Sequence, residues 1–267
     1  MILFYIILAT LAAGIGSVWV AAALSFGALA RYTQHMLSMA AGALLATAFM
    51  HLMPEAFESQ AGARELFATL LAGLIFFFLL DKAELWHHGH EHSHGHDLSH
   101  VGHDHSHSEH SHAPKAGSWA ILTGDSVHCF GDGILIASAF MADARLGWVA
   151  ALAVMAHEVP HHMGDLVALN QNTAHGKKSN AALVKVSLAG AVTAVGGLVG
   201  FWLVDQLQAY LPYFLVIASS SFIYVALADL IPQLQKRLSF KQTLAQIAWL
   251  IVGILMVTWV SNLAHVH

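Results

Sequence analysis

Long apolar runs separated by short polar breaks predict eight helices that cross a membrane. Each run is close to the roughly 20 residues that an α-helix needs to cross a hydrocarbon core of about 30 Å. Helices are expected because lipid offers no partner to open backbone groups. The predicted spans are 2–25, 36–56, 66–86, 118–141, 146–169, 181–207, 211–234 and 243–264. We therefore expect an all-α membrane protein.

The composition supports this fold class. Hydrophobic residues make up 57% of the 267 residues and charged residues only 10%, and the mean hydropathy is +0.62. These values lie outside the range of soluble globular proteins. The single cysteine, Cys129, excludes an intrachain disulfide. We expect the lipid bilayer as the surroundings of the chain, with neither a nucleic-acid partner nor an organic cofactor.

The basic residues predict how the chain sits in the membrane. When alternate loops are assigned to alternate sides, Arg64 and Arg145 fall on one side and the other nine of the 11 Lys and Arg residues fall on the opposite side. Cytoplasmic loops carry the excess of positive charge. Both termini are therefore predicted outside the cytoplasm, and the cell (inner) membrane is the expected location.

A histidine-rich segment divides the chain. Residues 87–112 read HHGHEHSHGHDLSHVGHDHSHSEHSH and hold twelve of the 21 histidines. Such low-complexity sequence favours disorder. It is either a weak, exchangeable metal site, since imidazole suits Zn, Cu and Ni, or a solvated linker. The expected organisation is three spans in 1–86, a disordered cytoplasmic loop in 87–116, a helix hairpin in 117–169 and three spans in 170–267.

Ionisable residues form facing stripes on the two helices of this hairpin. Residues three and four apart share a helix face, which groups Asp125, His128, Cys129 and Asp132 on one span, and Glu158, His161 and Asp165, with His157, on the next. The connector ADARLG (142–147) is short, so the spans are antiparallel and the stripes meet at one depth.

A bound divalent cation explains why such residues lie in an apolar span. Each Asp, Lys or Arg at a helix centre costs roughly 2.5–3.5 kcal/mol on insertion, and several carboxylates also repel one another. A cation held by Asp132, Glu158 and the imidazoles of His128, His157 and His161 removes the problem. Cys129 is a candidate thiolate ligand. This donor set suits Zn²⁺ best, and Fe²⁺, Mn²⁺, Co²⁺, Ni²⁺ and Cd²⁺ are alternatives. Pro160 frees the carbonyl of Ala156 beside the ligands.

At these residues the chain resembles the ZIP (Zrt/Irt-like) family of metal-ion transporters, in the branch with HNxxDG and HExPHExGD motifs. The counterparts are HCFGDG (128–133) and HEVPHHMGD (157–165). The resemblance implies transport of divalent ions, most of all Zn²⁺, into the cytoplasm by alternating access, with a homodimer left open. It implies a first site on His128, Asp132, His157 and His161, and a second on position 129, Asp132, Glu158 and His161.

Two positions depart from the family pattern, and they bear on the second site. The family Asn is Cys129 here, and the second Glu of the span-five motif is His162. The middle of span six, LAGAVTAVGGLVGF, also lacks a carboxylate. The centre therefore holds either one ion or two.

A short internal similarity predicts inverted repeats in a 3+2+3 arrangement. Span two contains HLMPEA (51–56) and span seven contains DLIPQL (229–234), and in the predicted topology these spans run in opposite directions. His51 and Glu55 then lie near the outer mouth of a pathway and Asp229 near the inner one, or these residues are ordinary helix ends. Other candidate pathway residues are His162 and the relay carboxylates Asp125 and Asp165, which alternatively charge the inner helix ends.

Three other functions fit parts of the sequence. HEVPH (157–161) matches the zinc-peptidase signature H-E-x-x-H, which makes an intramembrane metalloprotease the main alternative. Pro160 interrupts that motif, however, and His128 and Asp132 would crowd the position of the catalytic water. Cation-diffusion efflux carriers resemble six-span proteins, whereas eight spans are expected here. A membrane metal sensor without flux is the third alternative.

Overall fold

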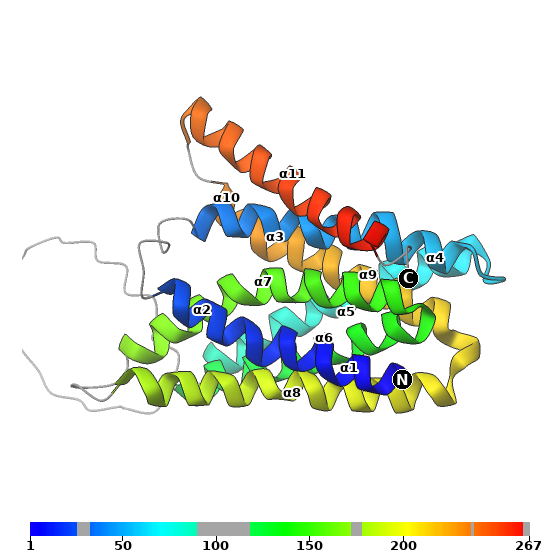
Figure 1. Cartoon of the computed structure of the whole chain (residues 1–267), viewed down its shortest axis with the longest axis horizontal. Helices are drawn as coiled ribbons and strands as arrows, with labels where there is room; N and C mark the ends of the chain where they lie inside the picture. Colours follow the sequence, from blue (N-terminus) through cyan, green and yellow to red (C-terminus); the bar gives the residue numbers. More distant parts are fainter. Residues whose placement is uncertain (26–32, 90–117, 172–177, 236–237, 264–267) are drawn as a thin grey trace, which may run out of the picture.

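The computed structural model describes residues 1–25, 33–89, 118–171, 178–235 and 238–263, and every regular element in these ranges is a helix. Eight helical segments follow one another (Figure 1). They are α1 (Ile2–Leu11), η1 (Ala12–Gly16) and α2 (Ser17–Ser25); α3 (Thr33–Thr47), η3 (Ala48–Leu52) and α4 (Met53–Phe57); α5 (Ala63–Gly89); α6 (Ser118–Ala142); α7 (Ala144–Gln171); α8 (Lys178–Gln206); η5 (Gln208–Tyr210), α9 (Leu211–Tyr224), η6 (Val225–Leu230) and α10 (Ile231–Leu234); and α11 (Phe240–Leu263).

The eight segments coincide with the eight predicted spans to within three residues at either end. Within the described ranges, six of them are long and apolar enough to cross a membrane by length and composition. The remaining two segments are α6 and α7, which carry the predicted metal ligands. The predicted all-helical fold class is therefore confirmed. Six of the eight candidate spans have the length and the hydropathy of a membrane-spanning helix.

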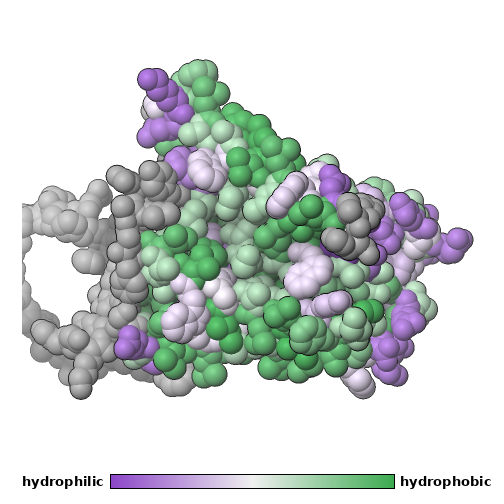
Figure 2. All heavy atoms as spheres, viewed as in Figure 1, coloured by the Kyte–Doolittle hydropathy of each residue, from purple (hydrophilic) through white to green (hydrophobic). Residues whose placement is uncertain are grey.

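The face of the bundle seen in Figure 2 is apolar along much of its length. Only 11% of the most apolar window is buried in α5 and likewise in α11, whereas 67% is buried in the segment from α3 to α4. Exposed side chains such as Phe76, Leu188 and Leu255 cover this surface. An apolar surface of this extent is not left to water, so these helices face lipid and α3 lies in the interior.

The hairpin of α6 and α7 occupies the centre of the bundle. Helix α6 packs mainly on α8, and α7 packs on α2 and α3. The two helices are separated by Asp143 alone, whose Oδ1 accepts a hydrogen bond from the backbone N–H of Arg145 at 2.8 Å. Because a side-chain oxygen of this kind caps the first turn, α7 begins at once and the connector is shorter than predicted.

Glycines allow the central helices to approach each other closely. A methyl group at Gly133 of α6 would collide with the backbone of Thr193, Gly196 and Gly197 in α8. Gly14 and Gly190 make the same kind of contact between η1 and α8. Small residues are the usual means of close helix packing in membranes, and here they fix α6 against α8.

The two segments with internal similarity share an irregular geometry. In each, a π-helical turn, η3 or η6, leads directly into a short helix with proline in its first turn, Pro54 in α4 and Pro232 in α10. The π-helical turns contain His51 and Asp229, respectively. The likeness between spans two and seven therefore extends from sequence to backbone.

The chain enters and leaves the bundle at the same end. The start of α1 and the end of α11 both lie at the right in Figure 1. Helix α5 continues to Gly89, three residues into the predicted loop. The rest of that histidine-rich segment lies outside the described residues.

Candidate metal centre

Helices α6 and α7 bring the predicted stripes of ionisable residues together. Asp125, Asp132, His157, Glu158 and His162 are each at most 3% exposed. The side chains of His128 and His161 are more open, at 31% and 38%. Seven residues of these two helices form two groups of side chains that could ligate a metal, and the groups share Glu158.

The first cluster consists of His128, Asp132, His157 and Glu158, whose ligand atoms lie within 4.8 Å of one another. His157 Nε2 lies 3.2 Å from Asp132 Oδ2 and 3.3 Å from Glu158 Oε1. His128 Nε2 lies 3.2 Å from the same Glu158 oxygen and 3.3 Å from His157 Nε2. Two imidazole nitrogens and two carboxylate oxygens therefore point at one place.

A backbone carbonyl sets which nitrogen of His157 is free. His157 Nδ1 lies 3.1 Å from the carbonyl oxygen of Ala153, to which only an N–H can donate. In the neutral ring Nε2 then carries a lone pair, the arrangement that such partners impose on metal-binding histidines. In that tautomer the lone pair faces the oxygens of Asp132 and Glu158.

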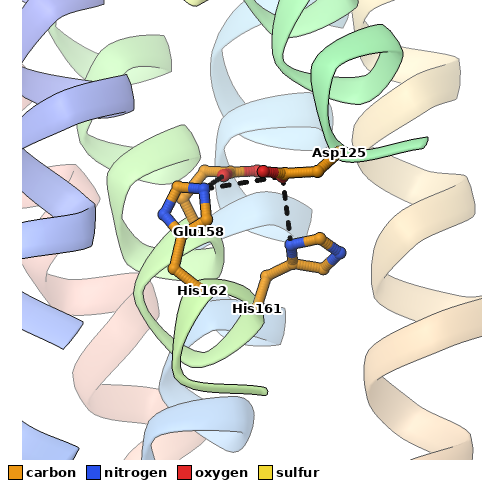
Figure 3. Close-up of side chains that lie close together, drawn as sticks. All are labelled: Asp125, Glu158, His161 and His162. Atoms are coloured by element: carbon orange, nitrogen blue, oxygen red, sulfur yellow. Dashed lines mark ion pairs between the residues drawn. The ribbon is translucent and has the colours of Figure 1, made fainter. Parts of the chain in front are cut away.

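The second cluster consists of Asp125, Glu158, His161 and His162. Figure 3 shows their side chains pointing toward one another from α6 and α7. His162 Nε2 lies 3.0 Å from Glu158 Oε2 and 3.6 Å from Asp125 Oδ1, and His161 Nδ1 lies 3.7 Å from the same Asp125 oxygen. Glu158 thus turns one carboxylate oxygen to each cluster.

Several donor atoms in the two clusters lack a hydrogen bond. Among the described buried atoms, Asp132 Oδ2, Glu158 Oε1, Asp125 Oδ2 and His162 Nε2 have none, and all but Asp125 Oδ2 find an ion-pair partner only when the histidine concerned is protonated. A buried polar group without a partner costs roughly 1–3 kcal/mol, and more when it is charged. A cation between these atoms would satisfy them, and N/O donor sets of this kind suit Zn²⁺ and its neighbours.

The structure distributes the predicted ligands differently from the family pattern. His161 stacks on the His128 ring, with the ring centroids 5.5 Å apart, but its Nδ1 belongs to the second cluster, 3.4 Å from Asp165 Oδ2. Cys129 is fully buried, and its Sγ lies 3.7 Å from Asp125 Oδ1 and 3.9 Å from Glu158 Oε2. The thiol stands beside the second cluster and belongs to neither.

Two residues predicted for the pathway belong to the second cluster instead. Asp125 and His162 converge on Glu158, and the sequence carried the signal: His162 follows Glu158 at i+4, and Asp125 precedes His128 at i−3. Ser17, by contrast, was missed. Its Oγ lies 3.1 Å from His162 Nδ1 although the two are 145 residues apart, and no local pattern marks it.

The remaining predicted pathway residues lie outside both clusters. His51 Nδ1 is 3.5 Å from Ser261 Oγ of α11. Glu55 is half-buried in α4, and Asp229 is exposed and accepts a hydrogen bond from Gln233 Nε2 at 2.9 Å. These three residues therefore add no ligand to either cluster, and their role in a pathway stays a prediction.

Open space adjoins one side of the clusters. A methyl group added at Gly131 or at Gly164 would meet nothing within 4 Å. These glycines lie on the same helices as His128 and His161, the two most exposed donors. His128 and His161 are therefore the donors through which the clusters are most open to their surroundings.

The zinc-peptidase interpretation finds no support in this geometry. In H-E-x-x-H enzymes both histidines bind the same ion and the glutamate acts as general base. Here His157 and His161 fall in different clusters, and Glu158 is itself one of the grouped donors in both.

An apolar helical bundle with buried imidazole and carboxylate donors on two central helices defines a multi-pass membrane protein with a candidate metal centre. The chain belongs to the ZIP zinc transporter family, whose model matches residues 1–261. The resemblance predicted from the two motifs is thereby confirmed.

Similar proteins are named as zinc transporters. Zinc transporter ZIP4 of Homo sapiens is 28% identical over 255 residues, which cover 76% of this chain and 39% of the relative. Zinc transporter foi of Drosophila melanogaster is 35% identical over 163 residues, 60% of this chain and 22% of the relative. Zinc transporter ZIP13 of Pongo abelii is 25% identical over 248 residues, 86% and 67%. The chain thus spans about two fifths of the first relative and about a fifth of the second.

Proposed function

We propose that this protein moves divalent transition-metal ions, Zn²⁺ foremost, across the membrane into the cytoplasm. The first cluster is the site that the ion occupies halfway. Family membership and the names of the relatives, all zinc transporters, support the class of substrate.

The first cluster carries this proposal. Three of its four donors, Asp132, His157 and Glu158, are buried in a bundle with an apolar exterior. The free nitrogen of His157 faces two carboxylate oxygens at 3.2 and 3.3 Å. Such an arrangement is unfavourable when empty and favourable around a dication, because two carboxylates neutralise the charge of the ion. A neutral complex of this kind is what an ion needs in order to pass through a low-dielectric interior.

Eight spans with both termini outside the cytoplasm complete the proposal. The start of α1 and the end of α11 lie at one end of the bundle, which supports an even number of spans. The uneven distribution of Lys and Arg supports the orientation. The matching π-helical turns and prolines of spans two and seven support inverted repeats, which are typical of carriers that work by alternating access.

A flux assay in proteoliposomes tests the proposed function. The wild type should deliver Zn²⁺ to an indicator trapped inside, and Asp132→Asn should lower the apparent affinity for Zn²⁺ by at least about tenfold. Even outer partners of metal ligands contribute 10- to 100-fold, and Asp132 is a direct donor in this proposal. A panel of Fe²⁺, Mn²⁺, Co²⁺, Ni²⁺ and Cd²⁺ then ranks the ions.

Asp143→Asn is the matched control. It makes the same chemical change on the same hairpin, and Asn caps a helix as well as Asp does, so flux should stay at the wild-type level. Absence of ion flux in wild-type vesicles would refute transport. A fall in cytoplasmic Zn²⁺ when the protein is expressed in cells would show that the ion moves out of the cytoplasm and would contradict the proposed direction. Cleavage of a test substrate that stops in Glu158→Gln, with flux unchanged, would restore the protease alternative.

A further inference from the structure

Ser17 links the first helical segment to the metal-ligating helix α7. It is fully buried and directly follows the π-helical turn η1. Its hydroxyl donates to the carbonyl oxygen of Gly14 at 2.7 Å, which uses its only proton. The contact with His162 Nδ1 at 3.1 Å can then form only if the ring donates its N–H to Ser17 Oγ.

This hydrogen bond determines the free atom of His162. With the proton on Nδ1, the Nε2 of the neutral ring bears a lone pair. It is fully buried, has no hydrogen bond and faces Glu158 Oε2 at 3.0 Å and Asp125 Oδ1 at 3.6 Å. Asp125 Oδ2 also lacks a hydrogen bond. Lone pairs that face each other at these distances in a dry interior repel, unless a proton on Nε2 or a metal cation lies between them.

We propose that the second cluster is a metal site of its own, in which Ser17 positions His162 as a ligand. Its ligands are Asp125, Glu158, His161 and His162, two imidazoles and two carboxylates, and its ligand class is a borderline divalent ion such as Zn²⁺ or Co²⁺. It differs from both sites that the family motifs imply, because neither of those contains Asp125 or His162. Glu158 bridges the two ions, one carboxylate oxygen to each.

The pairing of Ser17 with His162 matches that of Ala153 with His157. In both pairs, an oxygen atom accepts a hydrogen bond from the ring N–H at Nδ1, so that Nε2 remains available to bind the ion. Outer partners of this kind are worth 10- to 100-fold in metal affinity. The inference rests on the proposed function in one respect: both clusters take the same class of ion.

Metal counting on the purified full-length protein in detergent tests the proposal. The twelve histidines of 87–112 are replaced by Ser so that they do not contribute. Zn²⁺ is counted by equilibrium dialysis, and Co²⁺ is followed by its visible absorption. We expect two ions per chain in this background and one in His162→Gln. In Ser17→Ala the second ion should bind 10- to 100-fold more weakly, with the first unchanged.

Two further variants separate the clusters. Asp132→Asn combined with His157→Ala removes donors of the first cluster and should still bind one ion. Ser138→Ala is the matched control for Ser17→Ala, since Ser138 is a fully buried serine that donates to the Ile134 carbonyl at 2.8 Å and contacts no histidine in the described part of the chain. It should bind both ions as the background does.

One ion in the background and none in the double variant would overturn the second site while leaving the proposed function intact. Equal titrations of Ser17→Ala and Ser138→Ala would overturn the role of Ser17. Since Ser17→Ala changes a single hydroxyl, it keeps the test decisive if His162→Gln does not fold. Two bound ions without any flux in vesicles would contradict the proposed function and leave the second site standing.

Discussion

Two of the four imidazoles in the two clusters are oriented by a neighbour that belongs to neither cluster. The carbonyl of Ala153 holds His157, and the hydroxyl of Ser17 holds His162. Side chains held in this way do not need to be reordered when the ion arrives, which lowers the entropic cost of binding. In the proposed metal sites, affinity should therefore depend on Ala153 and Ser17 as well as on the ligands themselves.

Cys129 gives a sharp prediction at the residue scale, because its thiol lies close to both clusters without belonging to either. Co²⁺ bound to the wild type should show no intense near-ultraviolet band of the kind that a thiolate ligand produces. Cys129→Ala should retain Zn²⁺ affinity within a factor of about three, since a ligand or its outer partner would be worth tenfold or more. A thiolate band that disappears in Cys129→Ala would make the thiol a ligand.

Helical periodicity was sufficient to find most of the centre. The spacing of His128 and Asp132, and of Glu158 and His162, puts them on single helix faces, and the short connector brings these faces to one depth. The sequence could not settle which cluster His161 joins, because that depends on its side-chain direction. It could not reveal Ser17 either, since only tertiary packing brings α2 against α7.

The contact between α6 and α8 gives a prediction at the scale of elements. Gly133→Ala should lower the melting temperature, because its methyl group would push against backbone atoms of Thr193, Gly196 and Gly197 that cannot move aside alone. Overpacking of this kind costs about 1–3 kcal/mol, which corresponds to a fall of several degrees in Tm. Thermal denaturation in detergent, followed by size-exclusion chromatography, measures the shift.

Gly131→Ala is the control, two residues away on the same helix. Its methyl group would enter open space, and alanine is the better helix former, so Tm should hold or rise. Equal losses in the two variants would mean that the close approach of α6 and α8 does not limit stability.

The elements themselves were more predictable than their irregularities. Runs of apolar residues define helix ends to within three residues, because the thickness of a bilayer sets the length of a span. The π-helical turns η1, η3 and η6 were not predicted, since an extra residue in a turn leaves the hydrophobic pattern unbroken. Proline marks two of the three, and η1, which directly precedes Ser17, has no such mark.

At the scale of the whole molecule, the predicted topology determines which mouth of the pathway faces the cytoplasm. The charge bias places the turn between α4 and α5 outside and the connection between α10 and α11 inside. Gln60 and Ser239 are exposed positions in these two regions. In a Cys129→Ala background, which has no other cysteine, single cysteines at the two positions report the side on which each lies.

Gln60→Cys should react with a membrane-impermeant maleimide applied to intact cells, whereas Ser239→Cys should react only after the cells are permeabilised. The physical reason is the cost of moving basic loops across the membrane, which keeps Lys236, Arg237 and Lys241 in the cytoplasm. Labelling both after permeabilisation controls for reactivity. The reverse labelling pattern would mean that the protein has the opposite orientation in the membrane, and that the proposed direction of metal movement is opposite as well. Labelling of both positions in intact cells would rule out an odd number of spans between them.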